Sequence, residues 1–191
     1  MKTSEWPINI PNILTVARIL LTPLFVILLI KNLFIHALIV FTLAGISDGL
    51  DGFIARYFNQ RTIMGAYLDP IADKLLLSAA FITLAILTAI PAWLTVIVIS
   101  RDILILAGIA VFTITDIKVT IKPSIVSKFT TAAQLGTIFI VLLGFRFPTV
   151  VTAEQPAFWI TAGLTILSGL HYMIAGVSIL QAGLENNQPK S

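Results

Sequence analysis

Six long apolar runs dominate this sequence, and each has about the length that an α-helix needs to cross a lipid bilayer. Charged or turn-forming residues separate these runs, which cover roughly residues 13–30, 34–56, 66–90, 92–115, 126–145 and 157–182. Six spans use most of the 191-residue chain and leave little besides connections. The sequence therefore predicts an all-α integral membrane protein with six transmembrane helices, built as one domain over residues 1–191.

The composition excludes several other classes of protein. Apolar residues make up 58% of the chain and charged residues only 11%, whereas soluble domains usually carry about 25% charged residues. The net charge of +3 in so apolar a chain indicates loop orientation or contact with lipid headgroups, and no nucleic-acid partner is expected. Because there is no cysteine, disulfides and thiolate metal sites are excluded, and oxygen or histidine must bind any metal.

The first twelve residues form a lead-in that differs from the apolar runs. Trp6 suits the headgroup level of a membrane, and Asn12 is placed to cap a helix, so we expect a short N-terminal interfacial helix over 1–12. Glu5, the early prolines Pro7 and Pro11 and the lack of a small-residue cleavage pattern favour retention of this segment in the mature protein.

Lysines and arginines between the predicted spans are distributed unevenly over the two sides of the membrane. One side collects six of them, and the other collects two, Lys31 and Arg146. The six are Lys2, Arg56, Arg61, Lys118, Lys122 and Lys190. Since basic residues concentrate in cytoplasmic connections, both termini are predicted to lie in the cytoplasm.

Four carboxylates lie in or beside the second and third predicted spans: Asp48, Asp51, Asp69 and Asp73. Charged groups inside a membrane are costly and therefore indicate function. Residues three or four apart share a face of a helix, so each pair faces one way, and two antiparallel helices can bring both pairs together. Four such carboxylates repel one another unless cations lie between them. Oxygen-only ligation suits Mg²⁺ or Mn²⁺ and does not suit zinc.

Small residues accompany the aspartates. Gly52 and Ala55 follow Asp48 at helical spacing, and Gly65 lies four residues before Asp69, which clears space for a ligand. Pro70 belongs either to the first turn of the third helix or to a kink in it, and both arrangements free backbone groups. Arg56 can reach a phosphate or one of the acids.

The residues alone leave two alternative roles open for the aspartates. The four acids could form interhelical ion pairs with Arg56 and Lys74. A cation or proton-coupled transporter also places acids within the membrane, but it tends to show repeats with broken helices, and the sequence shows no such repeat. Gly163, Gly169 and Gly176 in the last span are expected to allow close helix packing.

From Asp48 to Asp73 the chain reads D-x2-D-G-x2-A-R-x8-G-x3-D-x3-D, which resembles the signature of the CDP-alcohol phosphatidyltransferase family. The family's six-helix membrane core also matches the number of predicted spans. The resemblance implies a reaction in which a CDP-linked lipid such as CDP-diacylglycerol gives its phosphatidyl group to an alcohol and releases CMP. It also implies two divalent cations, a bacterial inner-membrane location with a cytoplasmic active site, and a homodimer.

The resemblance assigns roles residue by residue. Asp48, Asp51, Asp69 and Asp73 bind the metal ions, and Asp73 is also the general base that activates the acceptor hydroxyl. The positions that accommodate the cytidine nucleotide are Gly52, Ala55, Arg56 and Gly65.

The acceptor alcohol is predicted from other stretches. Residues 9–15 with Arg18, and residues 65–74, look most like bacterial phosphatidylglycerophosphate synthases, whose acceptor is glycerol 3-phosphate. Residues 100–102 and 122–134 are also similar to the family's cardiolipin synthases, whose acceptor is phosphatidylglycerol.

An anionic acceptor needs positive charge beside the metals, and Arg101, Lys128 and Arg18 are the candidates for its phosphate. Two structural alternatives remain. Arg101 could instead pair with Asp102 or bond another helix, and Lys128 could extend to the headgroups.

Overall fold

The computed structural model describes the backbone of residues 10–57, 63–114 and 125–186, and the side chains of residues 15–47, 72, 74–108 and 125–178. Within these ranges the chain is helical, without strands. The helices are α1 Ile10–Ile30, α2 Phe34–Tyr57, α3 Ile63–Ile86, α4 Ala92–Ile114, α5 Ile125–Gly144 and α6 Glu154–Asn186, with a short 3₁₀ helix, η1, at Pro148–Ala153.

Two helices end in tight turns that the backbone hydrogen bonds define. After α1, Asn32 has a φ of 57°, and Leu33 N–H donates to the Leu28 carbonyl over 2.9 Å. After α3, Thr88 has a φ of 58°, and Ala89 N–H donates to the Leu84 carbonyl over 2.9 Å. Both are Schellman motifs, in which a left-handed residue satisfies carbonyls at the helix end. They reverse the chain within a few residues.

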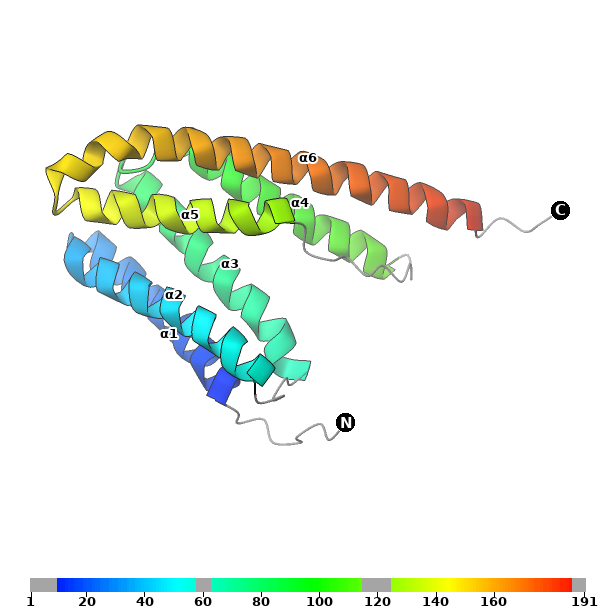
Figure 1. Ribbon diagram of the computed structural model, residues 1–191, viewed down its shortest axis with the longest axis horizontal. Helices are drawn as coiled ribbons and strands as arrows, with labels where there is room; N and C mark the ends of the chain where they lie inside the picture. Colours follow the sequence, from blue (N-terminus) through cyan, green and yellow to red (C-terminus); the bar gives the residue numbers. More distant parts are fainter. Residues whose placement is uncertain (1–9, 58–62, 115–124, 187–191) are drawn as a thin grey trace.

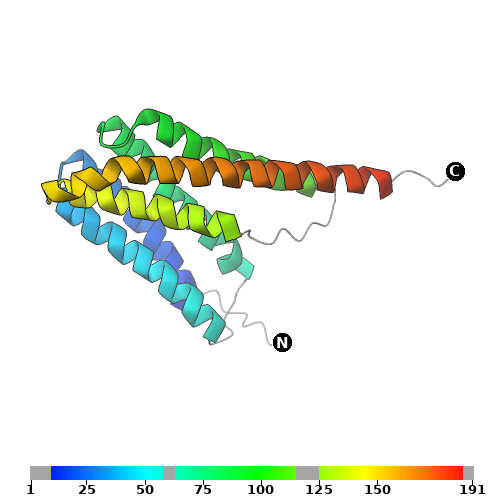
Figure 2. The same ribbon diagram turned by 45° about the horizontal axis from the view of Figure 1, so that its top comes forward.

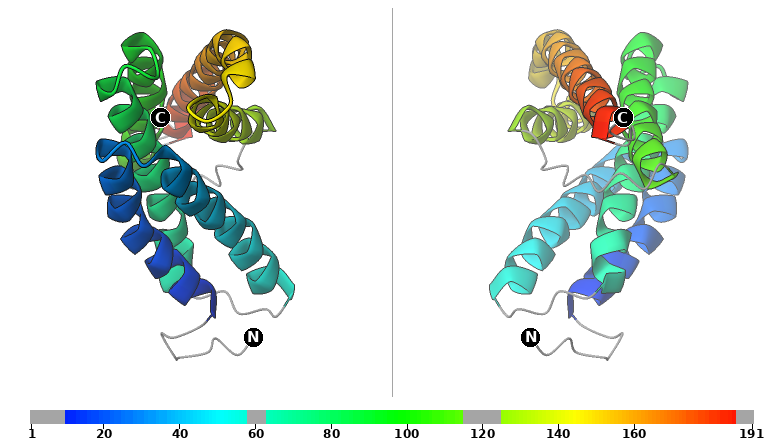
Figure 3. Two further views of the ribbon diagram at one scale, coloured as in Figure 1. Left: turned by 90° about the vertical axis from the view of Figure 1, so that its left-hand side faces the viewer. Right: turned by 90° about the vertical axis from the view of Figure 1, so that its right-hand side faces the viewer.

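The helices run back and forth between two ends of the molecule. Figure 1 shows the α1–α2, α3–α4 and α5–α6 connections together at the left, with the start of α1 and the end of α6 away from them. The views in Figures 2 and 3 agree that α4, α5 and α6 lie on one side, α1 and α2 on the other, and α3 between them. The group of α4, α5 and α6 and the group of α1 and α2 diverge from each other away from the connections.

The apolar core lies mainly toward the connection end. Phe25 of α1, Phe41 of α2 and Phe81 of α3 are buried there, and the rings of Phe25 and Phe41 lie 5.6 Å apart. Leu94 of α4 and Leu142 of α5 complete the cluster. Because this cluster takes residues from each of the helices α1 to α5, it holds the two diverging groups together at this end.

A seam of buried polar side chains joins α5 to α6. Thr137 and Thr161 share a hydroxyl–hydroxyl hydrogen bond of 2.8 Å. Thr130 donates to the carbonyl of Leu164 over 3.0 Å, and the Gln134 amide donates to Thr165 over 3.5 Å. In an apolar environment lipid offers no hydrogen-bond partners, so these bonds satisfy the buried hydroxyl and amide groups. They also fix the register of the two helices.

The outer surface of the described helices is strongly apolar. Leu20, Ile86 and Ile174 are among many large apolar residues that point outward, which is unusual for a protein in water. Trp93 and Trp159 are exposed near the connection end with their rings 5.1 Å apart. Among the described residues, the segments 125–144 and 148–178 are long and apolar enough to cross a bilayer. The helical fold is consistent with a membrane protein.

The helix bounds agree with the predicted spans to within four residues at every end, and the largest differences are at two ends. The third helix ends at Ile86, not near residue 90, because Thr88 begins the reversal. The last helix continues to Asn186. Because α3 begins at Ile63, Pro70 lies inside the helix, which excludes the first of the two alternatives for it, a place in the first turn. The expected interfacial helix falls mostly on residues 1–9, outside the described residues, and α1 begins at Ile10.

Candidate active site

The four aspartates lie on two consecutive helices. Asp48 and Asp51 are in the last part of α2, and Asp69 and Asp73 are in the first part of α3. Their side chains are outside the described residues. Continuous helix through both segments means that the spacings of three and four place each pair on one helix face, as the sequence predicts.

The two pairs also lie at matching heights. At 1.5 Å per residue, Asp51 and Asp48 are about 9 and 14 Å from the end of α2, and Asp69 and Asp73 are about 9 and 15 Å from the start of α3. Five residues separate the two helices, a connection that reaches about 20 Å at most. Both α2 and α3 pack against α1. The fold therefore permits the four carboxylates to face one site.

The donor chemistry of this pattern fits hard divalent cations. Carboxylate oxygens without histidine or cysteine are the ligand set that Mg²⁺ and Mn²⁺ prefer. Among the side chains that the structure describes, no group of three or more His, Asp or Glu residues could hold a metal ion. The nucleotide residues that the resemblance assigns, Gly52, Ala55 and Arg56 on α2 and Gly65 on α3, likewise lie on the helices of the motif, with side chains outside the described residues.

A buried ionic network lies next to the motif. Asp102 of α4 accepts hydrogen bonds through one oxygen, Oδ1, from both Lys74 Nζ of α3 and Arg101 Nη1, the latter at 2.8 Å. The Asp102 side chain is 7% exposed and that of Lys74 32%. The second oxygen, Oδ2, is buried without a hydrogen-bond partner among the described residues. Lys74 directly follows Asp73, so the network lies at the height of the aspartate pair on α3.

Arg101 extends the network to α5 and α6. Its Nη2 donates to Ser127 of α5 at 2.7 Å and to Ser168 of α6 at 2.9 Å, and its Nε also faces Ser168, at 3.3 Å. The guanidinium lies 5.8 Å from the centre of the Tyr172 ring. All three guanidinium nitrogens thus have protein partners, which the planar fork of arginine allows and a lysine ammonium would not. Both structural alternatives for Arg101, a pair with Asp102 and bonds to other helices, are present.

One glycine of α6 lies against the side chain of this arginine. A Cβ at Gly169 would lie 3.6 Å from Cγ of Arg101, so the aliphatic stem packs directly against the helix backbone. Close packing at Gly169 was expected from the sequence. At Gly163 a Cβ would meet nothing within 4 Å, so the same expectation was wrong for that residue.

The other two candidate phosphate ligands differ in burial. Arg18 is 1% exposed in the middle of α1, the helix that packs against both α2 and α3. Lys128 is exposed in the first turn of α5, one residue after Ser127. The structure therefore places Arg18 inside the helix group that carries the aspartates, and Lys128 at the rim near Arg101.

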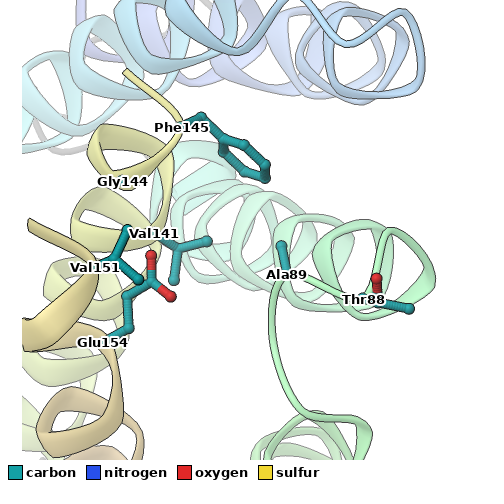
Figure 4. A pocket seen from close by; sticks show the side chains of 7 residues that line it. All are labelled: Thr88, Ala89, Val141, Gly144, Phe145, Val151 and Glu154. Atoms are coloured by element: carbon teal, nitrogen blue, oxygen red, sulfur yellow. The ribbon is translucent and has the colours of Figure 1, made fainter. Parts of the chain in front are cut away.

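A hollow of about 210 Å³ lies at the opposite end of the molecule from the aspartates. Figure 4 shows Thr88 and Ala89 on one side of it, and Val141, Phe145 and Glu154 on the other. Gly144 leaves space for the Glu154 carboxylate, because a Cβ there would lie 2.3 Å from its Oε1. Its lining includes none of the residues predicted for the site.

The sequence pattern singles out Arg101 but does not identify Lys74 as the partner of Asp102. Asp102 is a fifth acid inside a predicted span, and the cost of a charge in the membrane applies to it as it does to the other four.

The spacing of polar residues in the sequence also indicates the seam between α5 and α6. Thr130, Gln134 and Thr137 repeat at spacings of four and three residues, as do Thr161, Thr165 and Ser168.

Comparison with known proteins agrees with the resemblance that the aspartate pattern carries. The family model described as CDP-alcohol phosphatidyltransferase matches residues 8–167. The chain belongs to this family.

Individual relatives fall into two groups. Over 147 residues the chain is 40% identical to a human protein named cardiolipin synthase (CMP-forming), a match that covers 69% of this chain and 49% of the relative. It is 34% identical to the CDP-diacylglycerol–glycerol-3-phosphate 3-phosphatidyltransferase of Rickettsia typhi, covering 87% of this chain and 96% of the relative. The protein of the same name from Rickettsia bellii is 33% identical, with 92% and 97% covered. The chain spans about half the length of the human and rat relatives.

Proposed function

We propose that this protein transfers the phosphatidyl group of CDP-diacylglycerol to glycerol 3-phosphate, giving phosphatidylglycerophosphate and CMP. The observation that carries the proposal is the eight-residue pattern from Asp48 to Asp73, held at matching heights on α2 and α3. The Rickettsia relatives, which match almost end to end, bear the name of this activity.

The aspartates divide the chemistry between them. Asp48, Asp51, Asp69 and Asp73 would hold two Mg²⁺ or Mn²⁺ ions, which neutralise the diphosphate and the charge that builds on the leaving CMP. Asp73 takes the proton from the acceptor hydroxyl as this oxygen attacks the phosphorus of the lipid phosphate. The P–O bond to CMP then breaks, and the bond to the acceptor oxygen replaces it.

Other residues bind the two substrates. Gly52, Ala55, Arg56 and Gly65 accommodate the cytidine nucleotide in this proposal. Arg101, Lys128 and Arg18 supply positive charge for the acceptor phosphate. Lys128 is exposed and open to a ligand, whereas a phosphate at Arg101 competes with the hydroxyls of Ser127 and Ser168 for the same nitrogens.

A second acceptor is favoured by a specific observation. The chain shares 40% identity with the human relative named cardiolipin synthase, more than with the Rickettsia proteins. In this alternative, phosphatidylglycerol accepts the phosphatidyl group at the same aspartates. The family assignment favours either transferase over the transporter that the acids alone left open.

The proposal includes a membrane arrangement. All six helices span a bacterial inner membrane as one domain, and both termini and the aspartates face the cytoplasm. The back-and-forth course of the helices, with three connections at one end, supports this topology. A homodimer within the lipid is part of the same proposal.

The test is CMP release by purified protein in mixed micelles that contain CDP-diacylglycerol and Mg²⁺ or Mn²⁺. Glycerol 3-phosphate and phosphatidylglycerol are added in separate reactions. Release with glycerol 3-phosphate supports the main proposal, and release with phosphatidylglycerol alone supports the alternative. No release with either acceptor, together with ion flux in liposomes, contradicts both.

A further inference from the structure

We infer that Asp102 is a positioning residue: through Lys74 it fixes the turn of α3 that carries Asp69 and Asp73 against α4, α5 and α6. This inference rests on the proposed function, because it takes the aspartates as the metal site. It adds a role for two residues that lie outside the aspartate pattern.

The place of the Lys74–Asp102 ion pair along the helices is the first argument. Lys74 is twelve residues before the end of α3 and Asp102 ten residues after the start of α4, so the pair lies about 15 to 18 Å from the connection between them. The apolar core holds the helices together at the connection end, and the two groups diverge away from it. The ion pair thus ties α3 to α4 well away from that connection.

The Asp102 carboxylate is also buried. A buried charge needs compensation, and Asp102 obtains it from Lys74 and Arg101 through a single oxygen. Arg101 is in turn bonded to Ser127 and Ser168, so Asp102 is anchored to α5 and α6 as well. Because the Asp102 carboxylate is held in this way, it gives the Lys74 ammonium one defined position, and Lys74 can adopt few other rotamers.

Lys74 lies close to Asp69 and Asp73 on the same helix, α3. Lys74 is the residue after Asp73 and the fifth after Asp69, so a shift or rotation of α3 at Lys74 moves both carboxylates with it. Metal sites lose affinity when the partners that orient their ligands are removed. Loss of the ion pair should therefore weaken metal binding although neither residue is an assigned ligand.

The test measures binding of Mn²⁺ alone to the purified full chain, by the electron paramagnetic resonance signal of free Mn²⁺. We expect Lys74→Met and Asp102→Asn each to weaken Mn²⁺ binding by about tenfold, the lower end of what loss of an orienting partner costs. The double variant should bind Mn²⁺ no more weakly than the single variant with the lower affinity. Ser168→Ala is the matched control, because it removes the two hydrogen bonds from Arg101 to Ser168 and leaves the Lys74–Asp102 pair in place.

A simple charge effect predicts that the two single variants change the Mn²⁺ affinity in opposite directions. Removing the positive Lys74 would tighten Mn²⁺ binding, removing the negative Asp102 would weaken it, and the double variant would return to the wild-type affinity. That pattern overturns the inference, as do unchanged affinities in both single variants. If Asp102→Asn does not fold, Lys74→Met decides alone, since Asp102 keeps its bond to Arg101 there.

Hydrogen exchange of α3 separates failure of the inference from failure of the proposed function. Without metal, Lys74→Met should raise amide exchange over residues 69–77, and Ser168→Ala should not. Wild-type protein that binds no Mn²⁺ contradicts the proposed metal site, and the exchange data then decide whether the ion pair holds α3. If the wild type binds Mn²⁺ and Lys74→Met changes neither the amide exchange of α3 nor the Mn²⁺ affinity, only the inference is contradicted.

Discussion

Asp73 differs from the other aspartates in having a proposed second task, the acceptance of a proton. Asp73→Asn keeps the size and one oxygen of the side chain but removes its basicity. General-base catalysis contributes roughly 10²- to 10⁴-fold, so CMP release should fall by at least about 100-fold while CDP-diacylglycerol binding persists. Glu154→Gln likewise replaces a carboxylate by an amide, at the start of α6 and so at the opposite end of the molecule, and should leave release unchanged. Full turnover by Asp73→Asn would remove Asp73 from the mechanism.

Arg101 is the residue whose environment the sequence could least predict. Its neighbour Asp102 was visible, but Ser127 and Ser168 lie 26 and 67 residues away along the chain. Only the packing of α4 against α6, with Gly169 at the contact, brings them together. The aspartate motif, in contrast, is local on each helix, so helical spacing alone predicted which carboxylates share a face.

The fork of Arg101 leads to a stability prediction. Arg101→Lys keeps the charge but cannot bond Asp102, Ser127 and Ser168 together. Losing hydrogen bonds of a charged group costs about 1.5–3 kcal/mol, which lowers Tm by about 4 °C or more in a chain of this size. Thermal unfolding in detergent measures this. Arg146→Lys, on the exposed α5–η1 connection, is the control, and an equal Tm for both variants would contradict the role of the fork.

At the scale of helices, the apolar runs predicted six elements and most of their ends. What they could not show is where the backbone reverses. The run around residues 86–90 is apolar apart from Thr88, and Thr88 adopts a left-handed conformation that β-branched residues disfavour. Pairing of α3 with α4 in three dimensions determines that turn. Proline usually marks the first turn of a helix, but α3 begins at Ile63 and Pro70 lies inside it, so Pro70 could not mark the start of this helix.

The polar seam between α5 and α6 gives a prediction for this pair of helices. Thr161→Val removes the hydroxyl bond to Thr137 and should cost about 0.6 kcal/mol, up to about 1.7, the range for interhelical bonds in membranes. A double-mutant cycle with Thr137→Val should recover most of this cost as coupling. Thr42→Val, whose hydroxyl bonds only within its own helix in the described contacts, should show no coupling to Thr161. Absence of coupling between 137 and 161 would contradict the seam.

At the scale of the whole molecule, the alternation of the helices and the bias of lysine and arginine predict one orientation. The chain has no cysteine, so single cysteines can be placed freely. In spheroplasts of a bacterial host, an impermeant maleimide should label Asn32→Cys and Thr149→Cys, which lie in connections at one end. Ser191→Cys should react only after lysis. Labelling of Ser191→Cys in intact spheroplasts would reverse the proposed topology.

The central claim is that the aspartates of α2 and α3 serve a metal-dependent transfer of a phosphatidyl group to glycerol 3-phosphate. Mass spectrometry of the lipid products tests it most directly, with CDP-diacylglycerol, both acceptors present together, and either Mn²⁺ or excess chelator. We predict phosphatidylglycerophosphate and CMP in equal amounts with the metal and neither with the chelator. Cardiolipin as the only new lipid would contradict the proposed acceptor, and undiminished product in chelator would contradict the role of the aspartates.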